Sequence, residues 1–222
     1  MEIIKTSNLK KSYMLGKVEV KALNGVDTSV EQGEFVAIMG PSGCGKSTFL
    51  NLAGMLDTPT SGEIYLEGND VTNMNSNTRA EYRLKYIGFV FQFFNLFNEL
   101  TVMENVMFPM MLNKLSDYKD RSKELLNLVG LGDRLHHLPS ELSGGQQQRV
   151  TIARSLANNP KILLADEPTG NLDTKSSIEI IELFRKLNQE REQTIVMVTH
   201  SPEIGGMADR ILHFRDGTIE NI

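Results

Sequence analysis

The sequence predicts an α/β fold with a mostly parallel sheet between layers of helices. Four short apolar runs, rich in valine and isoleucine and without alternation, end at polar or glycine-rich junctions, as parallel strands covered on both faces do. They span 35–39, 87–91, 162–165 and 195–198. Helix-compatible stretches follow several of these runs, most clearly 46–55 and 175–190, and this alternation is typical of α/β proteins.

The two ends of the chain have a different pattern. Residues 2–9 and 18–30 look extended and are joined by 11–16, which predicts a second, antiparallel β-subdomain at the N-terminus. Residues 211–219 are predicted to form a hairpin whose turn is Asp216-Gly217. The sequence ends three residues after this hairpin, so we expect no appended regulatory domain.

Residues 93–159 contain no convincing strand. The apolar side chains of this stretch have helical spacing, which indicates a helical insertion. They include Val102, Val106, Met110, Leu125, Leu126 and Val129. We therefore expect a single domain over residues 1–222, with a nucleotide-binding core at 1–92 and 160–222 and a helical subdomain at 93–159.

The composition excludes several classes of protein. With 23 Lys+Arg against 28 Asp+Glu the net charge is −5, which argues against a dedicated nucleic-acid binder. The single cysteine excludes an internal disulfide framework. No apolar run approaches the roughly 18–20 residues of a membrane span, and the first residues lack the layout of a signal peptide. We expect a cytoplasmic protein that reaches a membrane only through a partner.

Residues 40–47, Gly-Pro-Ser-Gly-Cys-Gly-Lys-Ser, match the phosphate-loop pattern G-x-x-x-x-G-K-[ST] at every position. A strand-like run precedes them and a helix-compatible run follows. The glycines let successive amide N–H groups point at phosphate oxygens, and the N-terminus of the helix adds positive partial charge. Lys46 is expected to reach the β- and γ-phosphates and Ser47 to bind Mg²⁺. The alternative is a glycine-rich turn that binds nothing.

Two acidic residues follow the apolar run at 162–165. A magnesium ion held by one hydroxyl needs a carboxylate as well, and Asp166 supplies it where ligands bind in open α/β sheets. Glu167 is then placed to orient or deprotonate a water molecule for attack on the γ-phosphate. The alternative is a solvated strand end.

A second helix start lies at Leu142-Ser143-Gly144-Gly145-Gln146, called the pentad below. Ser143 and Gln146 have the spacing of a capping box, which is a sufficient structural explanation. The paired glycines cost the helix roughly 1 kcal/mol each relative to alanine. They are also explained if the backbone approaches a ligand closely.

The phosphate loop, the pentad and the acidic pair resemble those of the ATP-binding cassette (ABC) family, as do Gln92, Asp173 in 170–173 and His200. Their order and spacing agree over nearly the whole chain, and the pentad is the specific element. The resemblance implies a phosphate-loop NTPase core. It also implies an ATP-dependent homodimer in which two cassettes pack head to tail, so that the pentad of one covers the γ-phosphate bound by the other.

The resemblance also implies roles for individual residues. Tyr13 stacks on adenine, Gln92 contacts Mg²⁺ and the attacking water, and His200 holds the γ-phosphate. The implied catalytic residues are Glu167, His200, Gln92 and Lys46, and the implied metal ligands are Ser47, Gln92 and Asp166. The implied nucleotide-binding residues are Tyr13, Gly40, Pro41, Ser42, Gly43, Cys44, Gly45, Lys46, Ser47, Thr48, Gln92, Ser143, Gly144, Gly145, Gln146, Asp173 and His200.

Three of these residues have ordinary structural explanations as well. Tyr13 is also explained as an aromatic residue at a strand end, with Val20 or other residues of 14–20 packing on the base. Gln92 is also explained as a surface residue, and His200 as a histidine at a strand end. Cys44 lies beside Lys46 and a helix N-terminus, which favour its thiolate form and predict a reactive thiol.

We interpret the chain as the ATPase subunit of an ABC transporter, with ATP and Mg²⁺ as cofactors and a separate transmembrane permease as partner, on the inner face of the cell membrane. Residues 18–23 and 128–143, with Arg134, His137 and Pro139, look most like the lipoprotein-releasing and macrolide-export group, so the cargo is expected to be a lipoprotein, macrolide or peptide. Cell-division and antimicrobial-peptide cassettes are similar too.

Residues 93–111 carry four phenylalanines and four methionines. This soft apolar surface suits a groove for a cytoplasmic helix of the permease, and core packing is the alternative.

Three rival functions stay open. A soluble cassette acting on DNA or ribosomes usually has paired cassettes or long insertions, which this sequence lacks. A small-molecule kinase would leave the pentad without a purpose. A scaffold that only binds ATP is disfavoured by the intact Asp166-Glu167 pair.

Overall fold

A six-stranded sheet forms the centre of the computed structural model, which describes residues 1–220. Its strand order is β10-β9-β3-β8-β7-β6. The four predicted runs are β3 (Phe35–Met39), β6 (Ile87–Phe91), β7 (Ile162–Asp166) and β8 (Thr194–Val198), and all pair in parallel. The predicted α/β class is therefore confirmed.

The predicted C-terminal hairpin extends this sheet. Strand β9 (Arg210–Arg215) pairs in parallel with β3, and β10 (Thr218–Glu220) turns back on it through Asp216 and Gly217, whose φ values are 48° and 78°. Positive φ at both turn residues is the geometry that Asp-Gly favours in a tight hairpin.

Two buried clusters lie on opposite faces of the large sheet. In β3, Phe35 joins the cluster packed under the helices, whereas Val36 and Ile38 join the cluster under the small sheet. Likewise, Leu163 and Leu164 of β7 face opposite ways. Because successive side chains are buried on both faces, the strands read as continuous apolar runs rather than as alternating ones.

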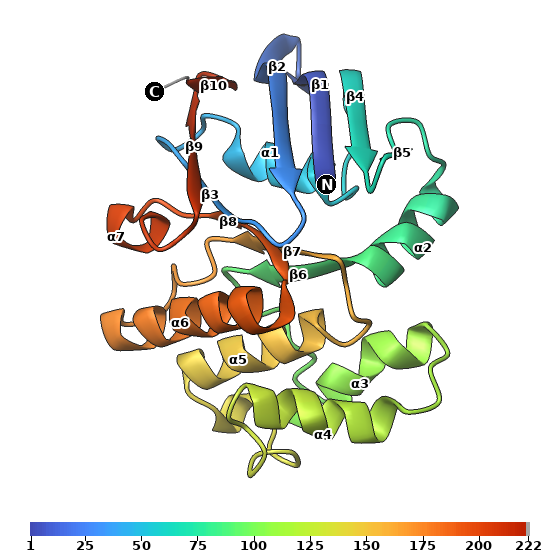
Figure 1. Cartoon of the computed structure of the whole chain (residues 1–222), viewed down its shortest axis with the longest axis vertical. Helices are drawn as coiled ribbons and strands as arrows, with labels where there is room; N and C mark the ends of the chain where they lie inside the picture. The colour runs from blue at the N-terminus through green and yellow to red at the C-terminus, as the bar shows by residue number, and fades with distance from the viewer. Residues whose placement is uncertain (221–222) are drawn as a thin grey trace.

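The small sheet covers one of these faces together with helix α1 (Lys46–Ala53), as Figure 1 shows. Its order is β2-β1-β4-β5 and all its pairs are antiparallel. The strands are β1 (Glu2–Leu15), β2 (Val18–Glu31), β4 (Ser61–Leu66) and β5 (Asn69–Asp70). The antiparallel sheet was predicted, but 11–16 is no linker, because β1 continues to Leu15, which pairs with Val18.

Helix α2 (Ser76–Tyr86) is absent from the sequence-based prediction. None of its side chains is buried, so it has no apolar stripe for periodicity to detect. Its one local start signal is Asn75, whose side chain accepts a hydrogen bond from the Thr78 amide at 3.0 Å.

The stretch between β6 and β7 is helical, as predicted. It contains α3 (Val102–Leu112), α4 (Tyr118–Leu128), the short 3₁₀ helix η1 (Pro139–Glu141) and α5 (Gly144–Ser155). The six apolar residues named for this stretch are all at most 3% exposed and share one cluster. The bounds proposed for a helical subdomain, 93–159, stay a prediction.

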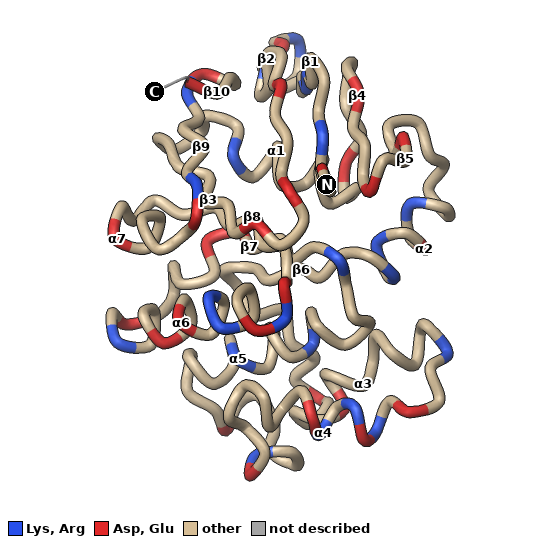
Figure 2. Tube along the Cα trace, viewed as in Figure 1, with Lys and Arg blue, Asp and Glu red and all other residues tan. Residues whose placement is uncertain are grey.

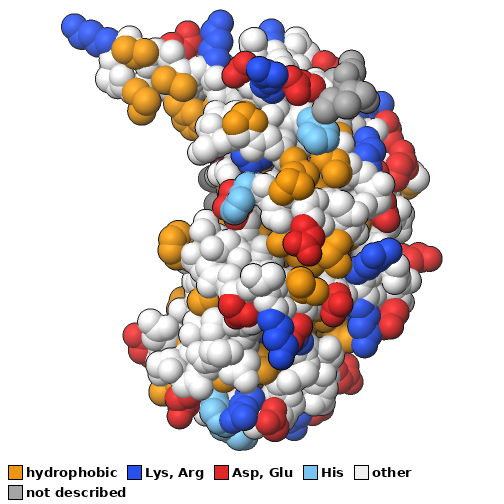
Figure 3. All heavy atoms as spheres, turned by 90° about the vertical axis from the view of Figure 1, so that its left-hand side faces the viewer, with side chains coloured by type: hydrophobic (Ala, Val, Ile, Leu, Met, Phe, Trp, Pro, Cys, Tyr) orange, Lys and Arg blue, Asp and Glu red, His pale blue; other side chains and the backbone are white. Residues whose placement is uncertain are grey.

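Acidic and basic residues are interspersed along α4 and α6 (Thr174–Arg191) in Figure 2, so neither helix presents a surface of one sign. Within residues 1–220, every helix falls short of a membrane span in length and apolar character. Figure 3 shows that the molecule is hollowed on one side, between the small sheet at its upper end and the helical insertion at its lower end.

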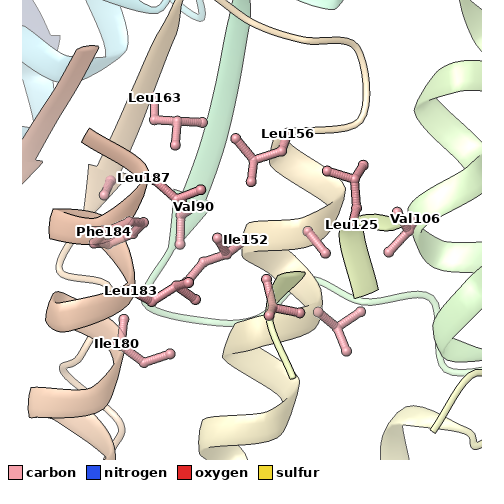
Figure 4. Close-up of a cluster of buried hydrophobic side chains, with 14 of the residues drawn as sticks. Val90, Val106, Leu125, Ile152, Leu156, Leu163, Ile180, Leu183, Phe184 and Leu187 are labelled. Carbon is pink, nitrogen blue, oxygen red and sulfur yellow. The ribbon is translucent and has the colours of Figure 1, made fainter. Parts of the chain in front are cut away.

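Helix α6 anchors the cluster under the helices. Figure 4 shows Ile180, Leu183, Phe184 and Leu187 of α6 beside strand and α5 residues of the same cluster. Phe184 is fully buried. A large aromatic side chain at such a position contributes both apolar burial and close packing.

Phe184→Ala is therefore expected to lower the free energy of unfolding by about 3–5 kcal/mol, because it leaves a cavity in the core. Urea denaturation measures the change. The exposed neighbour on the same helix gives the control, since Lys186→Ala is expected to change stability by no more than about 0.5 kcal/mol. Equal effects of the two substitutions would contradict this account of the core.

Candidate active site

A cavity of about 420 Å³ lies at the carboxyl-terminal edge of the large sheet. Most of its lining comes from the predicted phosphate loop, and the segments that follow β7 and β8 contribute one residue each, at the first and second position after the strand end. The lining residues are Ala22, Gly40, Ser42, Gly43, Gly45, Lys46, Ser47, Thr48, Glu167 and His200. The structure thus brings the loop together with two of the residues predicted to act on the γ-phosphate. Ala22, from β2, was not predicted.

The loop has the backbone that an anion site needs. Gly45 is the N-cap of α1 with φ 104°, and a Cβ there would collide with the backbone carbonyl oxygen of Ala22, so only glycine fits. No side chain caps α1 and its first turn has no acidic residue, which leaves its N–H groups free for phosphate oxygens.

Lys46 lies inside the loop and is 7% exposed. Its Nζ donates hydrogen bonds to the carbonyl oxygens of Gly40 at 2.9 Å and Pro41 at 2.8 Å. The ammonium group is thereby held within the loop, where it adds a full positive charge to the backbone dipoles.

Cys44 and Pro41 shape the loop without lining the cavity. The Cys44 amide donates to the Pro41 carbonyl at 3.4 Å, and the Cys44 carbonyl accepts from the Gly217 amide at 3.1 Å. The Cys44 side chain is only 4% exposed, with Sγ 3.8 Å from Lys46 Nζ. The expectation of a reactive thiol is corrected accordingly, since the sulfur lacks the exposure that such a thiol needs.

Ser47 and Asp166 meet although they are far apart in sequence. Ser47 Oγ donates to Asp166 Oδ1 at 3.0 Å. Burial raises the pKa of Asp166, and the hydrogen bond from Ser47 opposes that rise. A half-buried carboxylate beside a hydroxyl offers the hard oxygen ligands that Mg²⁺ prefers, so these two residues fit the predicted cation site.

Glu167 and His200 lie next to each other in the wall of the cavity. Glu167 Oε2 lies 3.5 Å from His200 Nδ1, and both residues line the cavity. Glu167 has a φ of 46°, unusual for a residue other than glycine, and its amide donates to the Val198 carbonyl at 3.1 Å. Such backbone geometry concentrates at functional sites, where it directs a side chain out of the regular strand path.

Gln92 is placed outside the cavity wall formed by the described residues. Its Nε2 donates to Asn171 Oδ1 at 3.2 Å, and Asn171 Nδ2 donates back to the Gln92 carbonyl at 3.0 Å. Gln92 is therefore tied to the loop that precedes α6. In the part of the chain that the structure describes, it makes no hydrogen bond to Ser47 or Asp166, and its predicted place at the metal stays a prediction.

Among the described residues, neither those of the pentad nor Asp173 line the cavity of their own chain. The predicted capping box of α5 is present, with Gln146 N donating to Ser143 Oγ at 3.3 Å and Ser143 N to Gln146 Oε1 at 3.0 Å. A Cβ on Gly145 would lie 3.1 Å from Ser176 Oγ, so packing against α6 is one reason for a glycine there.

Asp173 caps α6. Its Oδ1 accepts from Ser176 N at 3.0 Å and its Oδ2 from Ser176 Oγ at 2.6 Å, and these hydrogen bonds lower the pKa of Asp173. The carboxylate thus has a structural role in addition to the predicted nucleotide contact.

Tyr13 is held by two residues that the sequence analysis missed. Its hydroxyl donates to Asp57 Oδ2 at 2.8 Å, and Asp57 Oδ1 accepts from Lys11 Nζ at 2.8 Å. Lys11 Nζ also lies 4.9 Å from the centroid of the Tyr13 ring. Burial and the Asp57 hydrogen bond raise the pKa of Tyr13. The ring is therefore fixed while 37% of the residue stays exposed, as a stacking platform requires.

Val20 is placed for the alternative contact with the adenine base. Val20 pairs with Tyr13 across the hairpin, so the two side chains share one face, and Val20 is 41% exposed.

Comparison with known proteins shows that the chain is similar to ABC transporter ATP-binding proteins. The family described as ABC transporter matches residues 23–170. An uncharacterized ABC transporter ATP-binding protein of Methanocaldococcus jannaschii is 52% identical over 222 residues, which cover 99% of each chain. The macrolide export ATP-binding/permease protein MacB of Syntrophobacter fumaroxidans is 47% identical over 224 residues, which cover 99% of this chain but 31% of that protein.

Solved structures of ABC transporter proteins have a similar fold. The ATP-binding cassette MJ0796, solved as a dimer in a post-hydrolysis state with ADP and Pi bound, matches with a TM-score of 0.90 and 43% identity over 98% of this chain and 97% of that one. The protein cbiO1 of Clostridium perfringens, part of the ABC transporter complex cbiONQ, matches with a TM-score of 0.89 and 29% identity over 99% of this chain and 87% of that one.

The hydrogen bond from Tyr13 to Asp57 allows the predicted stacking of Tyr13 on the adenine base to be tested. Asp57→Asn is expected to weaken the binding of a fluorescent ATP analogue by about three- to tenfold, since the charge that holds Tyr13 and Lys11 is lost. Titration of the analogue's fluorescence measures the Kd. The control is Asp70→Asn on β5, also at a surface carboxylate, which is expected to leave the Kd unchanged. Unchanged binding by Asp57→Asn would remove Tyr13 from the site.

Proposed function

This chain belongs to the ABC transporter family, and we propose that it is an ATP-hydrolysing subunit that powers a separate transmembrane permease. The observation that carries the proposal is the single cavity that unites the phosphate loop with Glu167 and His200, next to the Ser47–Asp166 pair. The match over nearly its whole length to proteins named as ABC transporter ATP-binding proteins supports it.

The proposed reaction is the transfer of the γ-phosphoryl group of ATP to water. The loop amides and Lys46 bind the β- and γ-phosphates and offset their negative charge, which is the main catalytic contribution in this class of reaction. Tyr13 supports the base. When bound at Ser47 and Asp166, Mg²⁺ supplies further charge neutralisation between the phosphates.

Glu167 acts on the water. Its carboxylate accepts a proton as the water oxygen forms a bond to the γ-phosphorus and the bond from that phosphorus to the β,γ-bridging oxygen breaks, which releases ADP and phosphate. His200, whose Nδ1 lies 3.5 Å from Glu167 Oε2, is placed to hold the γ-phosphate and to orient the carboxylate.

A second copy of the chain completes the site in this proposal. The pentad and Asp173 lie outside the cavity wall of their own chain as described, yet α5 begins at the pentad with backbone N–H groups suited to phosphate. Head-to-tail pairing brings them to the nucleotide of the partner. The related cassette MJ0796, solved as a dimer, supports the pairing of two copies, and in our proposal ATP joins them.

We propose further that a groove of about 250 Å³ between β6, the end of α2 and the helical insertion receives a cytoplasmic helix of the permease. Phe97 and Phe108 form part of its wall, with ring centroids 5.0 Å apart and exposed fractions of 43% and 37%. Exposed aromatic side chains around a concave surface suit the apolar face of a helix. The Phe- and Met-rich segment 93–111 thus supplies part of the groove.

Export of a lipoprotein, macrolide or peptide remains the proposed process, with the chain on the cytoplasmic face of the membrane. The relatives named as macrolide export proteins support export. In them the matched segment covers about a third of a protein whose name includes a permease as well.

Glu167→Gln tests the assignment of the base. The amide cannot accept the proton, so the rate of ATP hydrolysis is expected to fall by at least about 100-fold while ATP binding persists. Phosphate release measures the rate, and size-exclusion chromatography with ATP is expected to show a stable dimer. As a control, Glu203→Gln changes an exposed acid on the short helix α7 (Pro202–Gly205) and should hydrolyse ATP normally. Wild-type turnover by Glu167→Gln would reject the base.

Phe108→Asp tests the groove. A buried, unpaired carboxylate is costly, so co-purification with the permease from membranes is expected to fall by at least about tenfold. Met14→Asp, which changes an apolar side chain of 66% exposure on the distant β1–β2 hairpin, is expected to retain co-purification. Full co-purification of the Phe108 variant would place the permease elsewhere.

A further inference from the structure

The side chain of Gln148 on α5 connects three segments of the chain. It is completely buried. Its Nε2 donates to the carbonyl oxygens of Pro168 at 2.6 Å and Phe91 at 3.2 Å, and its Oε1 lies 3.1 Å from Thr151 Oγ1. Gln148 is not among the residues proposed to bind the nucleotide or to act on the water.

The orientation of the amide follows from its neighbours. Two carbonyl oxygens can only accept, so the NH₂ group must face them, and the amide oxygen must then face the Thr151 hydroxyl. Both N–H donors of Gln148 therefore have carbonyl partners, and its Oε1 shares the single hydroxyl hydrogen of Thr151 with the Gln148 backbone carbonyl oxygen, which lies 2.8 Å from Thr151 Oγ1. Glutamate lacks the donors, methionine lacks both donors and acceptor, and asparagine is one methylene shorter.

The two carbonyls stand next to residues predicted to act on the attacking water. Phe91 directly precedes Gln92, and Pro168 directly follows Glu167. Gln148 itself follows Gln146, the last residue of the pentad, by two positions on the same helix. One buried amide thus joins the helix that presents the pentad to the backbone on which Gln92 and Glu167 stand.

A second tie from α5 reaches the same segment. Arg154 Nη1 donates to the Asn95 carbonyl at 2.6 Å, and Arg154 Nη2 donates to the Phe94 carbonyl at 3.1 Å. Because α5 holds the backbone on both sides of Gln92, a displacement of α5 displaces that residue with it.

We infer that Gln148 is a positioning residue that keeps Gln92 and Glu167 in register with the pentad, so that turnover depends on it and nucleotide affinity does not. This inference rests on the proposed ATP hydrolysis. The phosphate loop and Tyr13, which bind the nucleotide in that proposal, make none of the hydrogen bonds of Gln148.

Gln148→Met tests the inference, because methionine has a similar length and cannot bridge the two carbonyls. We expect kcat for ATP hydrolysis to fall by about tenfold or more, since small misplacements of reacting groups have large kinetic effects. The KM for ATP and the Kd of a fluorescent ATP analogue are expected to stay within about twofold. All rates are measured well below the midpoint of thermal unfolding of each variant.

Asn188→Leu is the matched control. Asn188 on α6 is also buried, and its Nδ2 bridges the carbonyls of Gly33 at 2.7 Å and Gln193 at 3.0 Å. These carbonyls precede β3 and β8, at the edge of the sheet opposite the cavity. Asn188→Leu is expected to lower the midpoint of unfolding as Gln148→Met does, yet to keep kcat within about twofold.

Thr151→Val provides a second variant should Gln148→Met fail to fold. It leaves Gln148 in place but removes the hydroxyl that faces its amide oxygen, and a fall in kcat of about threefold or more at unchanged KM is expected. Wild-type kcat in a folded Gln148→Met variant, or in Thr151→Val when that variant is the one that folds, overturns the inference, as does an equal loss in Asn188→Leu. Absence of hydrolysis by the wild-type protein rejects the proposed function instead.

Discussion

Parallel pairing of β3, β8 and β7 is the constraint on which the site depends. In this register Val198 of β8 lies opposite both Ile38 of β3 and Asp166 of β7. The chain leaves all three strands at the same edge of the sheet, and the residues that follow within two positions are Gly40, Glu167 and His200. Groups far apart in sequence become neighbours because the strand ends are aligned, in the way that open α/β sheets form their ligand sites.

Sequence reasoning succeeded where the physical signal is local. Runs such as 162–165 identify strands buried on both faces, and the glycines of the loop identify backbone that side chains cannot adopt. It failed for α2 and β5, which bury no side chain, and for β4, where two buried residues, Ile64 and Leu66, are too few to identify a strand. The family resemblance, rather than any local pattern, supplied Tyr13, Gln92 and Asp173.

Contacts between distant segments had no local signal at all. Lys11 and Asp57 are 46 residues apart, and Gln148 and Phe91 are 57 residues apart, yet each pair is in hydrogen-bond contact. In sequence, Gln148 of the polar run Gln146-Gln147-Gln148 cannot be told from its two half-buried neighbours, and only the fold shows that it alone is fully buried. These residues position the site without belonging to its motifs, so only the assembled structure identifies them.

The charges of the site are arranged for a partner that the chain itself does not supply. Within residues 1–220 neither Lys46, which is buried, nor Asp166, which is half-buried, has a salt bridge. Backbone carbonyls hold the ammonium group, and Ser47 holds the carboxylate. Hydrogen bonds orient these charges without neutralising them, and unpaired buried charge is costly. In the proposed function a bound triphosphate offsets the charge of Lys46 and Mg²⁺ offsets that of Asp166, so the ligands themselves complete the electrostatics of the site.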